Sequence, residues 1–286
     1  MLNIKSIQGW KVALVILMLL PMLLGLSYAL LYSFGLVGIL NTGFTTSHWT
    51  EILQDESFWK CLFFSLGVGL ASVGLSLILA LAMVIYWRKA LTQGKLRILI
   101  YFPLAFPATV VGFIIYQSLS KTGFWSRVAY QLELISDIDS FPSLVNDAYG
   151  IGIILASCFI IAPFLTLILK SIFESEQVEK YGHIAQSLGA KRKSIVWKVT
   201  LPVLVTKVKT TLMLFLIFVI GSYEIPLILG RQNPKMITIS IVDKAQRFNL
   251  EDIPQAYAMA VVYVLFLIGI FIGFNALFQL KSRRYA

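Results

Sequence analysis

The stretch ESEQVEKYGHIAQSLGAKRKSIVWKVTLP, from Glu174 to Pro202, is the longest polar interruption in a very apolar chain. It separates two apolar runs, 149–169 and 210–230, and each of these is long enough to cross a membrane as a helix. The stretch is therefore expected to be a loop of defined structure between two membrane spans.

The first half of this loop has a helical pattern with one narrow apolar stripe, made by Val178, Tyr181, Ala185 and Leu188. Gly189 follows directly, where helices often stop in the left-handed conformation. A second short segment runs from Lys191 to Leu201 and is expected to end at Pro202. The pattern thus predicts two short helices with a corner at Gly189.

The rest of the chain predicts a membrane protein. Of its 286 residues 58% are hydrophobic and only 13% charged, which is too little polar surface for a soluble globular domain. Helices are expected in these runs because backbone polar groups cannot stay unpaired in lipid. We therefore predict an all-α polytopic membrane protein, a single transmembrane domain over 1–286 with no soluble module and six transmembrane helices at approximately 12–34, 61–87, 98–120, 149–169, 210–230 and 253–280.

The distribution of charge predicts the orientation of these helices. Lys and Arg gather in the connections 1–11, 88–97, 170–209 and 281–286, and most acids lie in the other connections. Since cytoplasmic connections are rich in Lys and Arg, both termini and the loop 174–202 are expected on the cytoplasmic side. The net charge of +10 then reflects topology and contact with anionic lipid, and with no basic soluble domain it does not indicate nucleic-acid binding.

Two interpretations of the loop 174–202 compete. An amphipathic helix on the membrane surface would place Lys191, Arg192 and Lys193 against lipid phosphates. The alternative rests on a specific spacing of Ala185, Leu188-Gly189-Ala190, Ile195 and Leu201-Pro202. This frame resembles the EAA loop in permease subunits of binding-protein-dependent type I ABC importers, with His183 and Ile184 at the positions of the family's Glu and first Ala.

The resemblance implies that the loop docks its short helix on a cytoplasmic ATPase subunit. The residues it assigns to ATPase coupling are His183, Ala185, Leu188, Gly189, Ala190, Ile195, Leu201 and Pro202. It further implies an ABC ATPase dimer, a second permease subunit (a homologue or an identical copy) and an extracytoplasmic substrate-binding protein as partners, in a bacterial cytoplasmic (inner) membrane.

Two apolar runs carry features of a solute pathway. Pro103 and Pro107, four residues apart, are expected to break the run 98–120 and free backbone carbonyls, which in a membrane must face protein or water. Glu224 is the one acidic residue within a membrane run, and Gly221 and Pro226, which bracket it, are expected to break the helix locally. A merely kinked helix and a structural carboxylate are the plainer alternatives.

Both segments also resemble those of importer permeases of the polyamine, iron and thiamine type, where they line the translocation path. The candidate pathway residues are Pro103, Pro107, Tyr116, Gln117, Ser222, Tyr223, Glu224 and Pro226.

The sequence holds no G-x-x-x-x-G-K-[ST] phosphate-binding motif, so ATP and Mg are expected on the partner ATPase and no cofactor on this chain. His48 and His183, the only histidines, lie on opposite predicted sides, and neither a metal site nor a catalytic set is expected. These absences predict a non-enzymatic subunit, and the resemblance implies that it is an importer permease that forms half of a solute pathway. A stand-alone secondary transporter and a membrane scaffold are the alternatives. The former would want several intramembrane ionisable residues or an inverted repeat.

Overall fold

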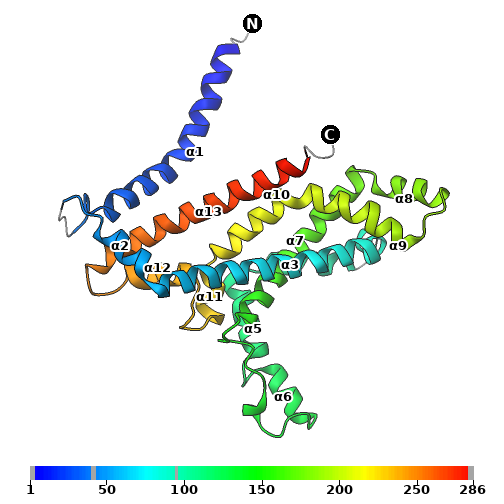
Figure 1. Ribbon diagram of the computed structural model, residues 1–286. Coiled ribbons are helices and arrows are strands. Elements are labelled where there is room, and N and C mark those ends of the chain that lie inside the picture. The colour runs from blue at the N-terminus through cyan, green and yellow to red at the C-terminus, as the bar shows by residue number, and fades with distance from the viewer. Residues whose placement is uncertain (1–3, 40–42, 94–95, 283–286) are drawn as a thin grey trace. The chain divides into compact units, whose positions relative to one another are not determined.

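The computed structural model describes residues 4–39, 43–93 and 96–282, and every regular element in that part of the chain is a helix (Figure 1). The chain forms two compact units, one made of residues 1–60 and 240–286 and the other of residues 61–239. Arg283 and Arg284, which belong to the connection 281–286 used above to predict orientation, lie outside the described residues.

The first unit combines α1 (Ile4–Ser33), α2 (Ser47–Gln54) and α13 (Asp252–Ser282). Aromatic rings join α1 to α13, since Tyr32 stacks on Tyr257 with ring centroids 4.5 Å apart. The indole N–H of Trp49 on α2 donates to the hydroxyl of Ser33 at 3.2 Å. The N-terminal part of α1 leaves its apolar side chains exposed, as a membrane helix can where it contacts lipid or another helix.

The second unit is built on α3 (Glu56–Gln93), α7 (Ile151–Ser175) and α10 (Leu201–Ile220). Buried serines lie along α3, and their hydroxyls donate to carbonyls one turn earlier, as from Ser72 to Val68 and from Ser76 to Ser72, both at 2.7 Å. Such side chains satisfy their own polar groups within the helix and allow helices to approach closely in lipid.

Within the part of the chain that the structure describes, five helical segments are long and apolar enough to cross a membrane, namely Gly9–Ser33, Glu56–Arg88, Ile151–Ser175, Arg192–Ile220 and Asp252–Ala276. The sixth expected span, 98–120, is not one continuous helix. It consists of α4 (Leu96–Tyr101), η1 (Pro103–Ala105) and α5 (Ala108–Leu119). The breaks fall at Pro103 and Pro107, where the missing N–H groups and the rings prevent an unbroken hydrogen-bond ladder.

The expected span 210–230 also needs correction, because its helix starts earlier and stops sooner. The α10 helix ends at Ile220, and a new helix, α11 (Glu224–Leu229), follows. Pro226 does not break the chain, since it lies in the first turn of α11, where a proline costs no internal hydrogen bond.

The expected helix end at Pro202 is wrong. After α8 (Val178–Ser187), the short α9 (Arg192–Ile195) runs through a π-helical segment, η3 (Val196–Thr200), straight into α10. The N–H of Leu201 bonds to the carbonyl of Val196, five residues back, and this wider turn accommodates the following proline. The remaining elements are α6 (Phe124–Gln131), η2 (Ile138–Ser140) and α12 (Ile237–Ala245).

Candidate functional site

The corner between α8 and α9 is closed by backbone hydrogen bonds. Gly189 has φ of 85°, the left-handed region expected for it. Its N–H bonds to the carbonyl of Gln186 at 2.9 Å, and the N–H of Ala190 bonds to that of Ala185 at 3.0 Å. This pair of bonds is the Schellman arrangement, which gives the end of α8 a fixed geometry. The predicted corner at Gly189 is thus present.

One flank of α8 forms an open groove of about 700 Å³ against η3 and the start of α10. The apolar side chains on this flank are unusually exposed, with 54% for Tyr181, 57% for Ile184 and 83% for Leu188. Further apolar residues and two basic ones line the groove: Ala185, Val199, Pro202, Val203, Lys198 and Lys207. Three of the predicted coupling residues, Ala185, Leu188 and Pro202, are therefore brought together here.

The predicted apolar stripe divides between two environments. Val178 is buried and fixes the beginning of α8, whereas Tyr181 and Leu188 stay exposed in the groove. Leu188 stays uncovered within this chain although it is a large apolar residue, so the stripe is not simply a core face. Large exposed apolar surfaces of this kind mark contact sites for protein or membrane.

The other flank of α8 faces a second pocket, which two of the remaining predicted coupling residues line. His183 and Ile195 line this pocket, of about 390 Å³, together with Arg88, Glu179, Gln186 and Arg192. Ala190 and Leu201 are half-buried and line neither of the two hollows. The eight residues named from the sequence thus surround α8 on both sides and do not form a single contact surface.

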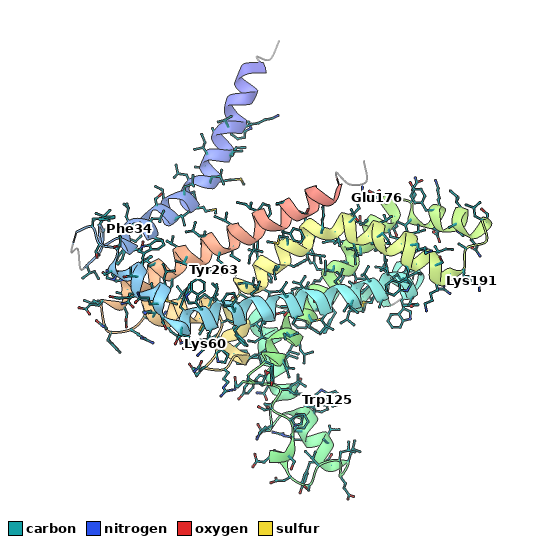
Figure 2. All side chains as sticks on the ribbon, in the orientation of Figure 1. Phe34, Lys60, Trp125, Glu176, Lys191 and Tyr263 are labelled. Atoms are coloured by element: carbon teal, nitrogen blue, oxygen red, sulfur yellow. The ribbon has the colours of Figure 1, made fainter. Side chains whose placement is uncertain are left out.

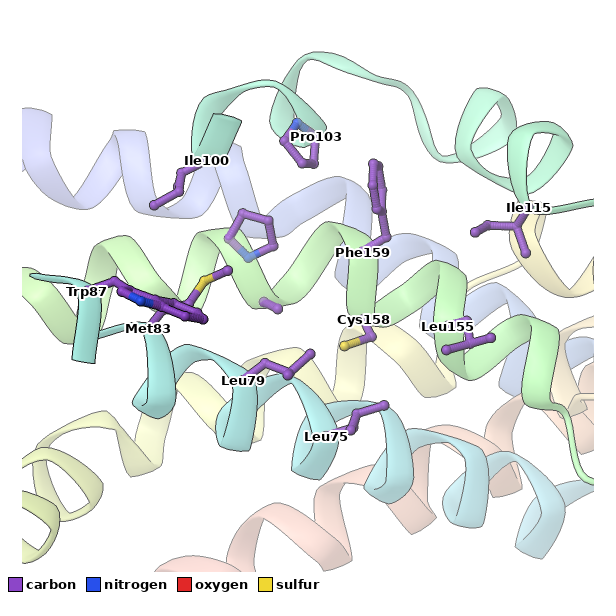
Figure 3. A pocket seen from close by; sticks show the side chains of 12 residues that line it. Leu75, Leu79, Met83, Trp87, Ile100, Pro103, Ile115, Leu155, Cys158 and Phe159 are labelled. Atoms are coloured by element: carbon purple, nitrogen blue, oxygen red, sulfur yellow. The ribbon is translucent and has the colours of Figure 1, made fainter. Parts of the chain in front are cut away.

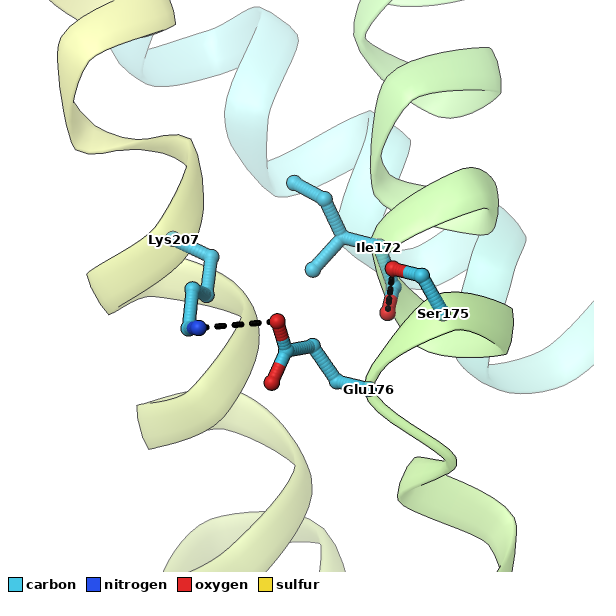
Figure 4. A network of polar contacts seen from close by, with 4 residues as sticks. All are labelled: Ile172, Ser175, Glu176 and Lys207. Atoms are coloured by element: carbon cyan, nitrogen blue, oxygen red, sulfur yellow. Dashed lines mark hydrogen bonds and ion pairs between the residues drawn. The ribbon is translucent and has the colours of Figure 1, made fainter.

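Two ion pairs hold the beginning of α8, and neither was found from the sequence. The Lys207 ammonium on α10 lies 2.8 Å from the Glu176 carboxylate, which follows α7 (Figure 4). The Arg88 guanidinium on α3 lies 2.7 Å from the Glu179 carboxylate on α8. These partners are far apart in the chain, and no local pattern would have indicated them. Figure 2 labels Glu176 just before the beginning of α8 and Lys191 just after its end.

The two predicted pathway segments pack against each other. Val111 of α5 and Ile225 and Leu229 of α11 belong to one buried apolar cluster. The contact is close at Gly112, where an added Cβ would lie 3.0 Å from Cδ1 of Ile228. The broken span 98–120 and the broken end of 210–230 therefore form one unit beside α7.

The polar candidates of the pathway lie near the ends of these segments. Tyr116 helps to line a small pocket of about 260 Å³ with polar residues such as Ser120, Ser143 and Asn146, and Gln117 is exposed. The Ser222 carbonyl accepts a 2.6 Å hydrogen bond from Thr238, and Tyr223 packs at the edge of the apolar cluster. Glu224 is exposed in the first turn of α11.

The three prolines named as pathway residues lie away from these polar side chains or are buried. Pro226 is buried, and Pro107 caps the beginning of α5 with an exposed ring. Pro103 lines a cavity of about 770 Å³ among apolar side chains of α3, α7 and the segment 100–115, including Leu79, Met83, Trp87, Cys158 and Phe159 (Figure 3). The candidate residues Pro103 and Tyr116 thus line different cavities.

Comparisons with known proteins identify the class to which this chain belongs. Residues 72–285 match the family described as "Binding-protein-dependent transport system inner membrane component", and the chain belongs to this family. It is a permease component of a binding-protein-dependent ABC importer, a multi-pass transport subunit that works with an ATPase and a substrate-binding protein. The stand-alone secondary transporter is therefore not favoured.

Among solved structures, the chain is similar to one in the "Crystal structure of a bacterial ABC transporter involved in the import of the acidic polysaccharide alginate". The match has a TM-score of 0.63 and 16% sequence identity, and covers 97% of this chain and 99% of the other. At this identity the likeness shows a shared fold. A comparison with curated proteins found no match.

Proposed function

We propose that this chain forms half of a solute pathway and couples it to a cytoplasmic ATPase through the loop 174–202. The docking surface is the groove flank of α8, defined by Tyr181, Ile184, Ala185 and Leu188, together with the corner at Gly189. A second permease subunit completes the pathway, and a substrate-binding protein delivers the solute from outside the bacterial inner membrane.

The observation that supports this proposal best is the exposure of Leu188 and its neighbours on a corner with fixed geometry. Apolar side chains that protrude from a rigid corner suit a pocket in a partner protein. A helix lying on the bilayer would instead turn its whole apolar stripe toward lipid, but Val178 at the beginning of the stripe is buried inside the protein.

We also propose the orientation predicted from the charges, and the pairing of Arg88 with Glu179 supports placing their two connections on the same side of the membrane. Arg88 and Glu179 are paired, and both lie in connections predicted to be cytoplasmic. Lys121 and Asp139, 3.6 Å apart, both lie in a connection predicted to be external. Both termini would then be cytoplasmic.

The mechanism implied by this assignment is alternating access. ATP binding closes two ATPase subunits and moves the docked loops together, so that the pathway opens toward the loaded substrate-binding protein. Hydrolysis, which we assign to the partner because the chain lacks a P-loop sequence, resets the pathway to face inward. In this scheme Tyr116, Gln117, Tyr223 and Glu224 offer polar groups to the solute at the ends of α5 and α10.

Co-purification from mild detergent tests the docking proposal. The tagged chain should bring the ATPase with it, and Ala185→Arg, which fills the groove with a charged side chain, should abolish this association. The matched control is Gln186→Arg on the other flank of α8, which should retain the ATPase. Association that survives Ala185→Arg, or is lost equally in both variants, would contradict a docking surface on the groove flank.

A further inference from the structure

The side chain of Arg88 connects three helices at the beginning of α8. Its terminal nitrogen donates a 2.7 Å hydrogen bond to the Glu179 carboxylate on α8. The guanidinium carbon lies 3.9 Å from the centroid of the Phe173 ring on α7. Arg88 itself belongs to α3, so a single residue contacts two other elements at once.

The chemistry of arginine suits this double contact. A planar guanidinium can present its face to an aromatic ring while its edge donates to a carboxylate, which a lysine ammonium cannot do with the same geometry. The Arg88 side chain is only 20% exposed, whereas that of Glu179 is 56% exposed. The Arg88 guanidinium is thus held in place by the residues around it, whereas the Glu179 carboxylate is more exposed and would move with α8.

The position of Glu179 on α8 gives the contact a mechanical consequence. Glu179 lies in the first turn of α8, next to the buried Val178, and Leu188 lies at the other end. At 1.5 Å per residue the two ends are about 13 Å apart along the helix. The ion pair therefore joins α3 to the end of α8 that lies opposite the exposed Leu188.

We propose that Arg88 is the positioning residue through which displacement of α8 is transmitted to α3, with Glu179 as its partner. The proposal rests on the docking of α8 to the ATPase proposed above. It adds that the movement of α8 is passed to the membrane-spanning helices at the contact with α3. Removing the link should leave the ATPase bound but should lower the amount of solute moved for each ATP hydrolysed.

The chain offers a closely matched control for the loss of one cation. Lys170 pairs with Glu174 at 3.9 Å, and its side chain is 22% exposed, but both residues lie on α7, so that this pair joins no separate elements. Arg88→Gln and Lys170→Gln therefore remove the same charge from side chains of similar exposure. Only the first of these removes a link between helices.

The experiment measures ATPase co-purification, ATP hydrolysis and solute uptake in proteoliposomes that contain the whole transporter. Glu179→Gln serves as the second variant, because an exposed carboxylate can be neutralised without disturbing packing around Phe173. We expect Arg88→Gln and Glu179→Gln to keep the ATPase and lose about tenfold in uptake per ATP. Lys170→Gln should match the unmodified protein.

Exchange of the two charges, with Arg88→Glu and Glu179→Arg in one chain, should restore uptake per ATP above that of either single charge reversal. Recovery on exchange shows that the two side chains act as a pair, and a purely structural role would instead lower the thermal stability of the single variants together with their uptake. Normal uptake per ATP in Glu179→Gln, no recovery on exchange, or an equal loss in Lys170→Gln would overturn the proposal while leaving the docking of α8 intact. ATPase binding that is insensitive to Ala185→Arg would remove the docking proposal and this inference with it.

Discussion

The backbone N–H of Ala190 donates a 3.0 Å hydrogen bond to the carbonyl oxygen of Ala185, and this bond closes the corner between α8 and α9. Both residues belong to the frame that resembles the permease loop. The corner requires a left-handed residue between them, and Gly189 supplies it with φ of 85°. The exposed flank of α8 is therefore presented at a fixed angle.

A side chain at Gly189 should loosen this corner. Apart from the two adjoining residues, no atom of the described residues lies within 4 Å of an added Cβ, so the cost is conformational and should be about 1–2 kcal/mol for Gly189→Ala, with a larger cost for Gly189→Val. Limited proteolysis of the loop 174–202 should become faster in both variants. The control is Gly182→Ala within α8, where the new Cβ would meet Ile195 at an ordinary 3.5 Å and should slow proteolysis instead. Equal rates in the Gly182 and Gly189 variants would argue against a strained corner.

The contact between α5 and α11 should be sensitive to volume. Gly112→Val would place a Cβ 3.0 Å from Cδ1 of Ile228, in a cluster that is already buried, and should cost about 1–3 kcal/mol of stability. Thermal unfolding in detergent measures the loss. Gly74→Val on α3, where the structure describes no atom from outside the helix within 4 Å of the added Cβ, should change the unfolding temperature much less. A larger effect at Gly74 would mean that α5 and α11 do not pack as described.

Glu224 distinguishes a pathway role from a structural one. Because its side chain is exposed in the first turn of α11, Glu224→Gln should leave stability nearly unchanged. If the carboxylate meets the solute, uptake should fall severalfold while ATPase association stays normal. Uptake and thermal stability are measured for Glu224→Gln and Glu224→Leu in parallel. Normal uptake in Glu224→Gln, with a stability loss only in Glu224→Leu, would place Glu224 outside the pathway.

Membrane orientation is tested by labelling single cysteines in intact cells with an impermeant thiol reagent. Asp139→Cys and Asn249→Cys should react from outside, because their connections are poor in Lys and Arg. Ser187→Cys at the end of α8 should react only after the membrane is opened. The two native cysteines, Cys61 and Cys158, are buried and provide a low background. External labelling of Ser187→Cys would reverse the proposed topology.

The sequence predicted those features that depend on local chemistry. The corner at Gly189 follows from glycine's access to positive φ, and the breaks near Pro103 and Gly221 follow from residues that interrupt helices. The same reasoning failed at Pro202, because a π-helical turn absorbs the proline and the helix continues. A proline or glycine shows where the hydrogen bonds of a helix are interrupted. Whether the helix ends there depends on how the surrounding residues pack.

The parts of the site that sequence reasoning missed depend on contacts between distant residues. Arg88 and Glu179 are 91 positions apart, and nothing in either neighbourhood distinguishes them from other surface charges. The division of α8 into a groove flank with Leu188 and an opposite flank with His183 depends on where α3 and α10 lie. Periodicity showed the apolar stripe, but it could not show that Val178 is buried while Tyr181 and Leu188 stay exposed.

The most direct test of the docking of α8 is site-specific photo-crosslinking in cells. A photoreactive phenylalanine analogue at Leu188, which is 83% exposed, should crosslink this chain to the ATPase subunit. The same analogue at Trp125, exposed on α6 in a connection predicted to be external, serves as the control and should give no such product. A crosslink to the ATPase from Leu188 and not from Trp125 is the predicted result. Crosslinking of Leu188 only to lipid, or an ATPase crosslink from Trp125, would contradict the proposed coupling surface.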